Sequence, residues 1–284
     1  MNTLVAVPSA LMAALCFGVG SVLQHEAARR APPQKALRLR LLFDLVRRPM
    51  WLVGTVLSIS SFAFLALALA FGPLVLVLPL AATDLVFALP LLALRRGERL
   101  SRSEVTGIVC TAGGVAVFLV ALPHSPSGTS AAAVRDWALV LVAVVGVVVL
   151  LAAVGASRAG PVRTASYAVC AAAMLALLDA LTRSTADRVR TDGFGALFHW
   201  EPYALMAVGV TALVLSQSAF QAGSLAISLP IIDTLEPICA VAIGVAVFDE
   251  QLAVSVWALA VQMAGAAAAV IGIVLLGRSP LATD

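Results

Sequence analysis

The chain has 284 residues, of which 62% are hydrophobic and only 12% are charged, and its mean hydropathy is +1.05. Because soluble globular proteins carry about 25% charged residues, the composition excludes that class and predicts an all-α integral membrane protein in contact with the lipid bilayer. The net charge of +3 arises from Lys and Arg between apolar runs, where membrane topology explains them, so it does not indicate nucleic-acid binding.

Nine apolar runs are each long enough to cross a bilayer as a helix, which takes about 20 residues. We expect these spans at residues 4–23, 51–71, 74–94, 104–122, 137–156, 164–182, 203–222, 225–248 and 254–276. Residues 36–48 carry leucines on one side and arginines on the other, which predicts an amphipathic helix on the membrane surface. A shorter helix is predicted at residues 194–200.

The basic residues of the connections predict the orientation of the chain. Most of the 18 Lys and Arg residues lie between spans one and two, three and four, and five and six, or after span nine. The other connections hold only Arg135, Arg183, Arg188 and Arg190. The positive-inside rule places the larger group in the cytoplasm, so we expect a multi-pass plasma-membrane protein with its N-terminus outside and its C-terminus inside.

Residues 72–100 and 224–252 resemble each other and predict an internal repeat. The matched positions are Leu78-Pro79 with Leu229-Pro230, Thr83 with Thr234, and Glu98-Arg99-Leu100 with Glu250-Gln251-Leu252. Spans one to four then correspond to spans six to nine, and the fifth span makes the count odd, which inverts the second copy. We therefore predict two inverted four-helix repeats, at 1–123 and 161–284, joined by a linking helix within 124–160. Such repeats are typical of secondary transporters, whose site lies near the midplane.

Three acidic residues lie inside the two matched spans. Asp233 and Glu236 are three residues apart, so a helix places both on one face, and Asp84 lies near the middle of its span. Carboxylates at that depth are costly unless they bind a cation or carry protons, so all three are predicted to bind ion or substrate, with Asp233 and Glu236 as metal ligands. The alternative is a structural role, in which they are protonated or hydrogen-bonded to Ser58, Ser60, Ser61 or Gln217.

Two further polar pairs are spaced four residues apart. Gln217 and Gln221 either line a polar path with the acids, which makes them candidate substrate-binding residues, or form ordinary interhelical hydrogen bonds. Asp179 and Arg183 are predicted to form a local ion pair on span six.

Prolines and small residues predict how the helices bend and pack. Four prolines lie inside the two matched spans, at Pro79, Pro90, Pro230 and Pro237. Each removes a backbone donor, and the resulting kink either lines a cavity or only serves packing. The small residues Gly113-Gly114 and those at 264–269 allow helices to approach closely, within the fold or in a homodimer.

The two matched spans end in related motifs, GERL at 97–100 and DEQL at 249–252. With the repeat layout, these motifs resemble the EamA-type repeats of the drug/metabolite transporter superfamily. The first half also contains CFGVGSVLQHEA at 16–27, RRPMWLVGTVL at 47–57 and FGPLVLVLPLAA at 71–82. In this it is similar to the NIPA branch, the magnesium transporter-like proteins. The resemblance implies a nine-span transporter fold and Mg²⁺ as the substrate.

The inverted repeat and the acids favour a transporter that moves a small solute or a divalent cation by alternating access, with Mg²⁺ and H⁺ as candidate ions. Because Mg²⁺ usually keeps several waters, a hydrated ion is expected. One alternative is an exporter of organic metabolites or cationic drugs, and another is a non-transporting membrane subunit. The sequence has no cluster of catalytic residues and no phosphate loop, so we expect neither an enzyme nor a cofactor.

Overall fold

The computed structural model describes residues 2–29, 49–123, 134–223, 225–252 and 255–279, and in these ranges it contains helices and no strands. Nine helical segments of this described part are long and apolar enough to span a membrane. The predicted fold class, an all-α membrane protein with nine spans, is thereby confirmed. The amphipathic helix predicted at 36–48 lies outside the described residues.

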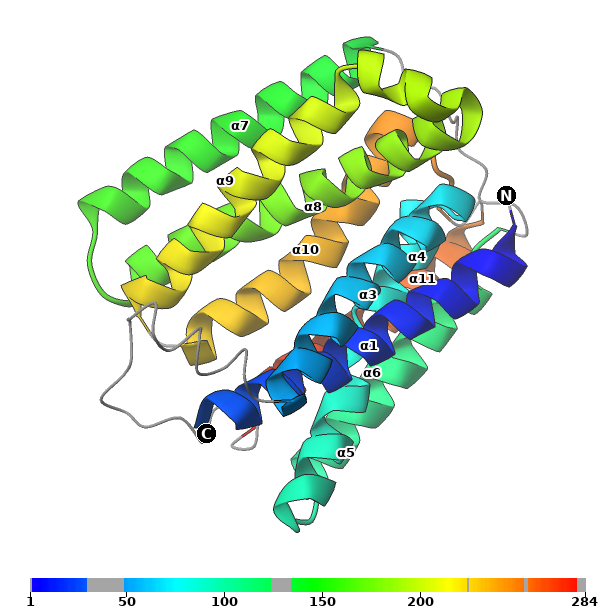
Figure 1. The fold of residues 1–284 in the computed structure, drawn as a ribbon. Helices are drawn as coiled ribbons and strands as arrows, with labels where there is room; N and C mark the ends of the chain where they lie inside the picture. Colours follow the sequence, from blue (N-terminus) through cyan, green and yellow to red (C-terminus); the bar gives the residue numbers. More distant parts are fainter. Residues whose placement is uncertain (1, 30–48, 124–133, 224, 253–254, 280–284) are drawn as a thin grey trace.

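The helices follow the predicted spans closely (Figure 1). They are α1 (Thr3–Arg29), α3 (Pro49–Phe71), α4 (Leu74–Ala81), α5 (Asp84–Arg96), α6 (Arg102–Val120), α7 (Val134–Ser157), α8 (Pro161–Asp192), η2 (Gly193–Phe198), α9 (Glu201–Ala222), α10 (Leu225–Phe248) and α11 (Val256–Gly277). The largest difference is in α8, which continues well beyond its predicted end at residue 182 and then turns into the short 3₁₀ helix η2.

Helix α8 is the most buried of the nine spans and lies at the centre of the fold. It packs against α9, α10, α7 and α3. Its Leu177 and Leu181 are fully buried in a core cluster that also contains Leu74 of α4 and Val247 of α10. The buried polar side chains of α8, Asp179 among them, are therefore enclosed by both halves of the chain.

Small residues bring α6 and α11 into close contact. A Cβ atom added at Gly114 would lie 2.4 Å from the backbone nitrogen of Ala269, and one at Gly265 would lie 2.6 Å from that of Phe118. The neighbouring Gly113 faces open space. Of the two predicted packing glycines, Gly114 thus holds the helices together and Gly113 does not.

The third span is divided into two helices, α4 and α5, where the sequence predicts one kinked helix. Ala82 and Thr83 have ψ angles of 4° and 9°, far from the value of about −42° in an α-helix. The Thr83 hydroxyl donates a hydrogen bond to the carbonyl oxygen of Leu80 at 2.6 Å, which competes with helical hydrogen bonding. Its matched residue Thr234 lies in α10, which is continuous despite two prolines, and the Thr234 hydroxyl has no partner among the described residues.

The two ends of the helix bundle differ in their polar residues. Helix α4 begins at one end of the bundle, where α8 and α10 terminate, and we call this end the Glu250 side. Helix α5 terminates with Arg95 and Arg96 at the opposite end, which we call the basic side. In Figure 1 the Glu250 side is at the top and the basic side at the bottom. An ion pair between Arg95 and Glu26, at 2.6 Å, joins α5 to α1 on the basic side.

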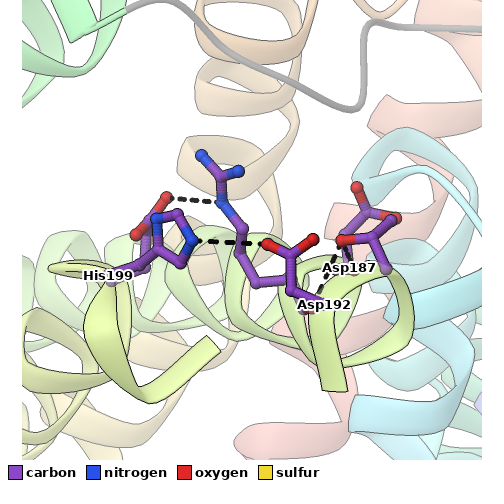
Figure 2. A network of polar contacts seen from close by, with 6 residues as sticks. Asp187, Asp192 and His199 are labelled. Atoms are coloured by element: carbon purple, nitrogen blue, oxygen red, sulfur yellow. Dashed lines mark hydrogen bonds and ion pairs between the residues drawn. The ribbon is translucent and has the colours of Figure 1, made fainter. Parts of the chain in front are cut away.

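On the Glu250 side, a polar contact between Asp192 and His199 and an ion pair between Arg188 and Glu201 hold the end of α8 to the start of α9. His199 Nε2 lies 3.3 Å from Asp192 Oδ2, and these two residues flank η2 (Figure 2). Arg188 pairs with Glu201 at 3.1 Å, and Arg190 pairs with Asp187. The short helix predicted at residues 194–200 is therefore present, and polar contacts fix both of its ends.

Candidate functional site

The three predicted acids, Asp84, Asp233 and Glu236, come together in the structure. Asp84 is the first residue of α5, and the other two lie on α10. The Asp233 carboxylate is close enough to those of Asp84 and Glu236 to interact electrostatically with both. All three side chains are half-buried. The first matched span thus contributes one acid to the cluster, and the second contributes two.

The break between α4 and α5 determines where Asp84 lies. Because α5 begins at Asp84, the carboxylate is at the positive end of the helix dipole, near the backbone N–H of Leu85. A Cβ atom at Gly18 of α1 would lie 2.5 Å from the Asp84 carbonyl oxygen, so only glycine permits this approach of α1 to α5. The break and Gly18 together position Asp84.

The acid cluster has no cationic partner among the described residues. No Lys, Arg or hydroxyl side chain in this part of the chain contacts Asp84, Asp233 or Glu236. Two of the three predicted serine partners are engaged elsewhere, since Ser61 donates to the carbonyl oxygen of Ala13 and Ser58 accepts from Gln24. Within the described residues, no three His, Cys, Asp or Glu side chains are close enough to coordinate a bare metal ion. The cluster therefore gathers acidic side chains without a protein counter-ion among the described residues, and it does not form a group of three donors around one point.

The structure does not bring the predicted Gln217 and Gln221 to the acids. Both are exposed on α9, and among the described residues neither forms a hydrogen bond or ion pair with the cluster. Helix α9 packs mainly on α8 and touches α10 only slightly.

The predicted ion pair between Asp179 and Arg183 is wrong. Arg183 Nη1 binds Glu250 Oε1, and the arginine also lies over the Phe248 ring, 4.2 Å from its centre. The carboxylate of Asp179 instead interacts electrostatically with that of Glu236. Asp179 is a fourth member of the acid cluster, and the local spacing concealed it because the stronger partner of Arg183 is distant in sequence.

Glu250 joins three helices on the Glu250 side. Its carboxylate accepts hydrogen bonds from the backbone nitrogens of Leu74 and Val75 at 2.8 and 2.7 Å, which satisfies the free N–H groups at the start of α4. The same carboxylate pairs with Arg183 of α8 and is fully buried. We call this set of contacts the Glu250 junction. The sequence shows Glu250 in the DEQL motif, but not which helix it contacts.

The matched motifs GERL and DEQL share a backbone conformation but differ in burial. Gly97 has a φ angle of 70° and the matched Asp249 has one of 51°, and both fall in the left-handed region. Each is followed by a glutamate. Glu250 is buried in its junction, whereas Glu98 is exposed on the basic side and its carboxylate has no contact with the described residues.

Comparison with known proteins identifies the family of the chain. The sequence pattern of the family described as Magnesium transporter NIPA matches residues 2–280. An uncharacterized protein of Corynebacterium glutamicum is 30% identical over 260 residues, which cover 90% of this chain and 89% of that protein. No solved structure matches the chain. Since the family match extends from the first span to beyond the last, the chain belongs to the NIPA family of magnesium transporters.

Proposed function

We propose that the chain carries Mg²⁺ across the plasma membrane and binds the ion in hydrated form between Asp84, Asp233 and Glu236. The observation that carries the proposal is the convergence of these three acids, without a protein cation, in the middle of a membrane-spanning fold. A charged residue at the bilayer centre costs about 3 kcal/mol or more, so a bound cation would stabilise the ionised form of three acids gathered there. Membership of a magnesium transporter family supports Mg²⁺ as that cation.

A hydrated ion fits the spacing of the acids. Mg²⁺ loses its waters reluctantly and usually keeps several of them in protein sites. The absence of a tight three-donor group among the described residues agrees with carboxylates that reach the ion through its water shell. The positive end of the dipole at the start of α5 repels a positive ion, so it weakens cation binding there and favours release.

The transport mechanism we propose is alternating access. The Glu250 junction ties α4 to α8 and α10 on one side of the acids, and the matched Glu98 makes no such contact with the described residues on the other. This asymmetry supports a state that is closed on the Glu250 side. With most basic connections in the cytoplasm, as proposed from the positive-inside rule, the Glu250 side faces outward.

Mg²⁺ binding to the purified protein in lipid nanodiscs tests the proposed site. Neutralising a carboxylate that holds a metal through water lowers affinity about 10- to 100-fold, so we expect such a loss for Asp233→Asn and for Glu236→Gln. Asp187→Asn is the matched control, because it removes an acid in an ion pair outside the cluster. Equal Mg²⁺ affinity in the wild type and both cluster variants would overturn the proposal.

A further inference from the structure

Asp179 and Arg183 lie one turn apart on α8 but have very different surroundings. An acid four residues before an arginine on a helix is well placed to pair with it. Arg183 is nevertheless bound to Glu250 and Phe248. Asp179 is only 6% exposed, and its Oδ2 atom has no hydrogen-bond partner among the described residues. The arginine thus leaves the acid one turn before it on α8 without a counter-charge.

The unpaired Asp179 extends the acid cluster onto the central helix. Its carboxylate interacts with Glu236, which in turn interacts with Asp84. A buried carboxylate without a partner is strongly disfavoured, so Asp179 is ionised in this state only when a cation lies beside it. With Arg183 held in the Glu250 junction, the cation bound by the neighbouring acids is the one within reach.

We propose that Arg183 exchanges carboxylate partners during transport, binding Glu250 in the closed state and Asp179 when the Glu250 side opens. In the closed state Asp179 is then free to help bind the transported cation. After opening, the positive charge of Arg183 replaces that cation at Asp179. The exchange rests on the proposed function and adds a residue and a release step to it.

The contacts of Glu250 explain why opening would move the arginine. Opening separates α4 from α10, so Glu250 loses the backbone donors of Leu74 and Val75 and becomes hydrated. An ion pair in water is weak, whereas Asp179 stays buried one turn from Arg183. Cation binding and closure of the Glu250 side then favour each other, because linkage between two sites is reciprocal.

A double-mutant cycle on Mg²⁺ affinity in nanodiscs tests the exchange. Glu250→Gln releases Arg183, and we expect it to weaken Mg²⁺ binding about 5- to 100-fold, the usual range of coupling between sites. Asp179→Asn should weaken binding by a comparable factor, and Asp179→Glu should restore it. In the Asp179→Asn background, Glu250→Gln should change affinity by less than about twofold, because Arg183 can then no longer displace the cation by pairing with Asp179.

Glu201→Gln is the matched control, since it removes a buried carboxylate that pairs with another arginine of α8 on the same side, without involving Asp179. Each variant is first checked for a monodisperse, cooperatively unfolding protein, and Glu250→Asp replaces Glu250→Gln if the latter does not fold. Independent, additive effects of Glu250 and Asp179 would overturn the exchange and leave the proposed function intact. A wild-type protein that binds no Mg²⁺ would overturn both.

Discussion

Replacing Gly244 by alanine should break the Glu250 junction. A Cβ atom at Gly244 would lie 2.6 Å from Glu250 Oε2, and ordinary contact begins at 3.4 Å, so the carboxylate must move by about 0.8 Å. Its hydrogen bond to the nitrogen of Val75 is 2.7 Å long, and such a movement extends it to the limit of hydrogen bonding. Because a hydrogen bond to a charged group contributes about 1.5–3 kcal/mol, we expect Gly244→Ala to lower stability by about 2 kcal/mol.

Denaturant titration of the detergent-solubilised protein measures this loss. Gly146→Ala is the control, because Gly146 is also helical and nothing lies near its missing Cβ atom. That variant should be as stable as the wild type or more stable, since alanine favours helix over glycine by about 1 kcal/mol. If Gly244→Ala is as stable as Gly146→Ala, the account of Glu250 as a tightly held junction is refuted.

Two further predictions concern glycines and left-handed backbone. Gly114→Ala should destabilise the protein by about 1–3 kcal/mol, because the Cβ atom would meet the backbone of Ala269, while Gly113→Ala should not; denaturant titration compares the two directly. Gly97→Ala should lower stability by about 1 kcal/mol because φ is 70°, although nothing obstructs its Cβ atom. Asp249→Gly should instead raise stability, because it removes a side chain from the left-handed region. A destabilised Asp249→Gly protein would contradict the assignment of backbone strain to that position.

The membrane spans could be predicted from the sequence because their signal is local and strong. An apolar run of about 20 residues forms a helix in lipid whatever its neighbours are, since every backbone group must be satisfied within the segment. The same reasoning misplaced the end of α8. Its residues from 183 to 192 are mostly polar, so hydropathy ends the span there, while the helix itself continues beyond the apolar part.

The site was predictable only as far as residue type and helix position reveal it. Asp84, Asp233 and Glu236 stand out because acids are rare in apolar runs. Asp179 did not, because an arginine follows it at ion-pair spacing, and only the fold shows that Arg183 binds Glu250. Competition for Arg183 by a residue distant in sequence cannot be predicted from the local spacing of charges.

The positions of the prolines also could not predict the break between α4 and α5. Both matched spans contain two prolines, yet only the first is divided. The difference accompanies a single hydrogen bond, which the hydroxyl of Thr83 makes to Leu80 and that of Thr234 does not make within the described residues. The repeat boundaries at 1–123 and 161–284, the homodimer and the membrane orientation stay predictions.

Mg²⁺ uptake into proteoliposomes tests the central claim most directly. We expect saturable Mg²⁺ uptake by the wild type, its loss in the Asp233→Asn/Glu236→Gln double variant, and its retention in Asp187→Asn. A parallel assay with tetraethylammonium tests for export of organic cations. Transport of that cation without Mg²⁺ uptake would contradict the magnesium carrier and favour an exporter, and a folded wild-type protein that moves neither ion would favour a non-transporting membrane subunit.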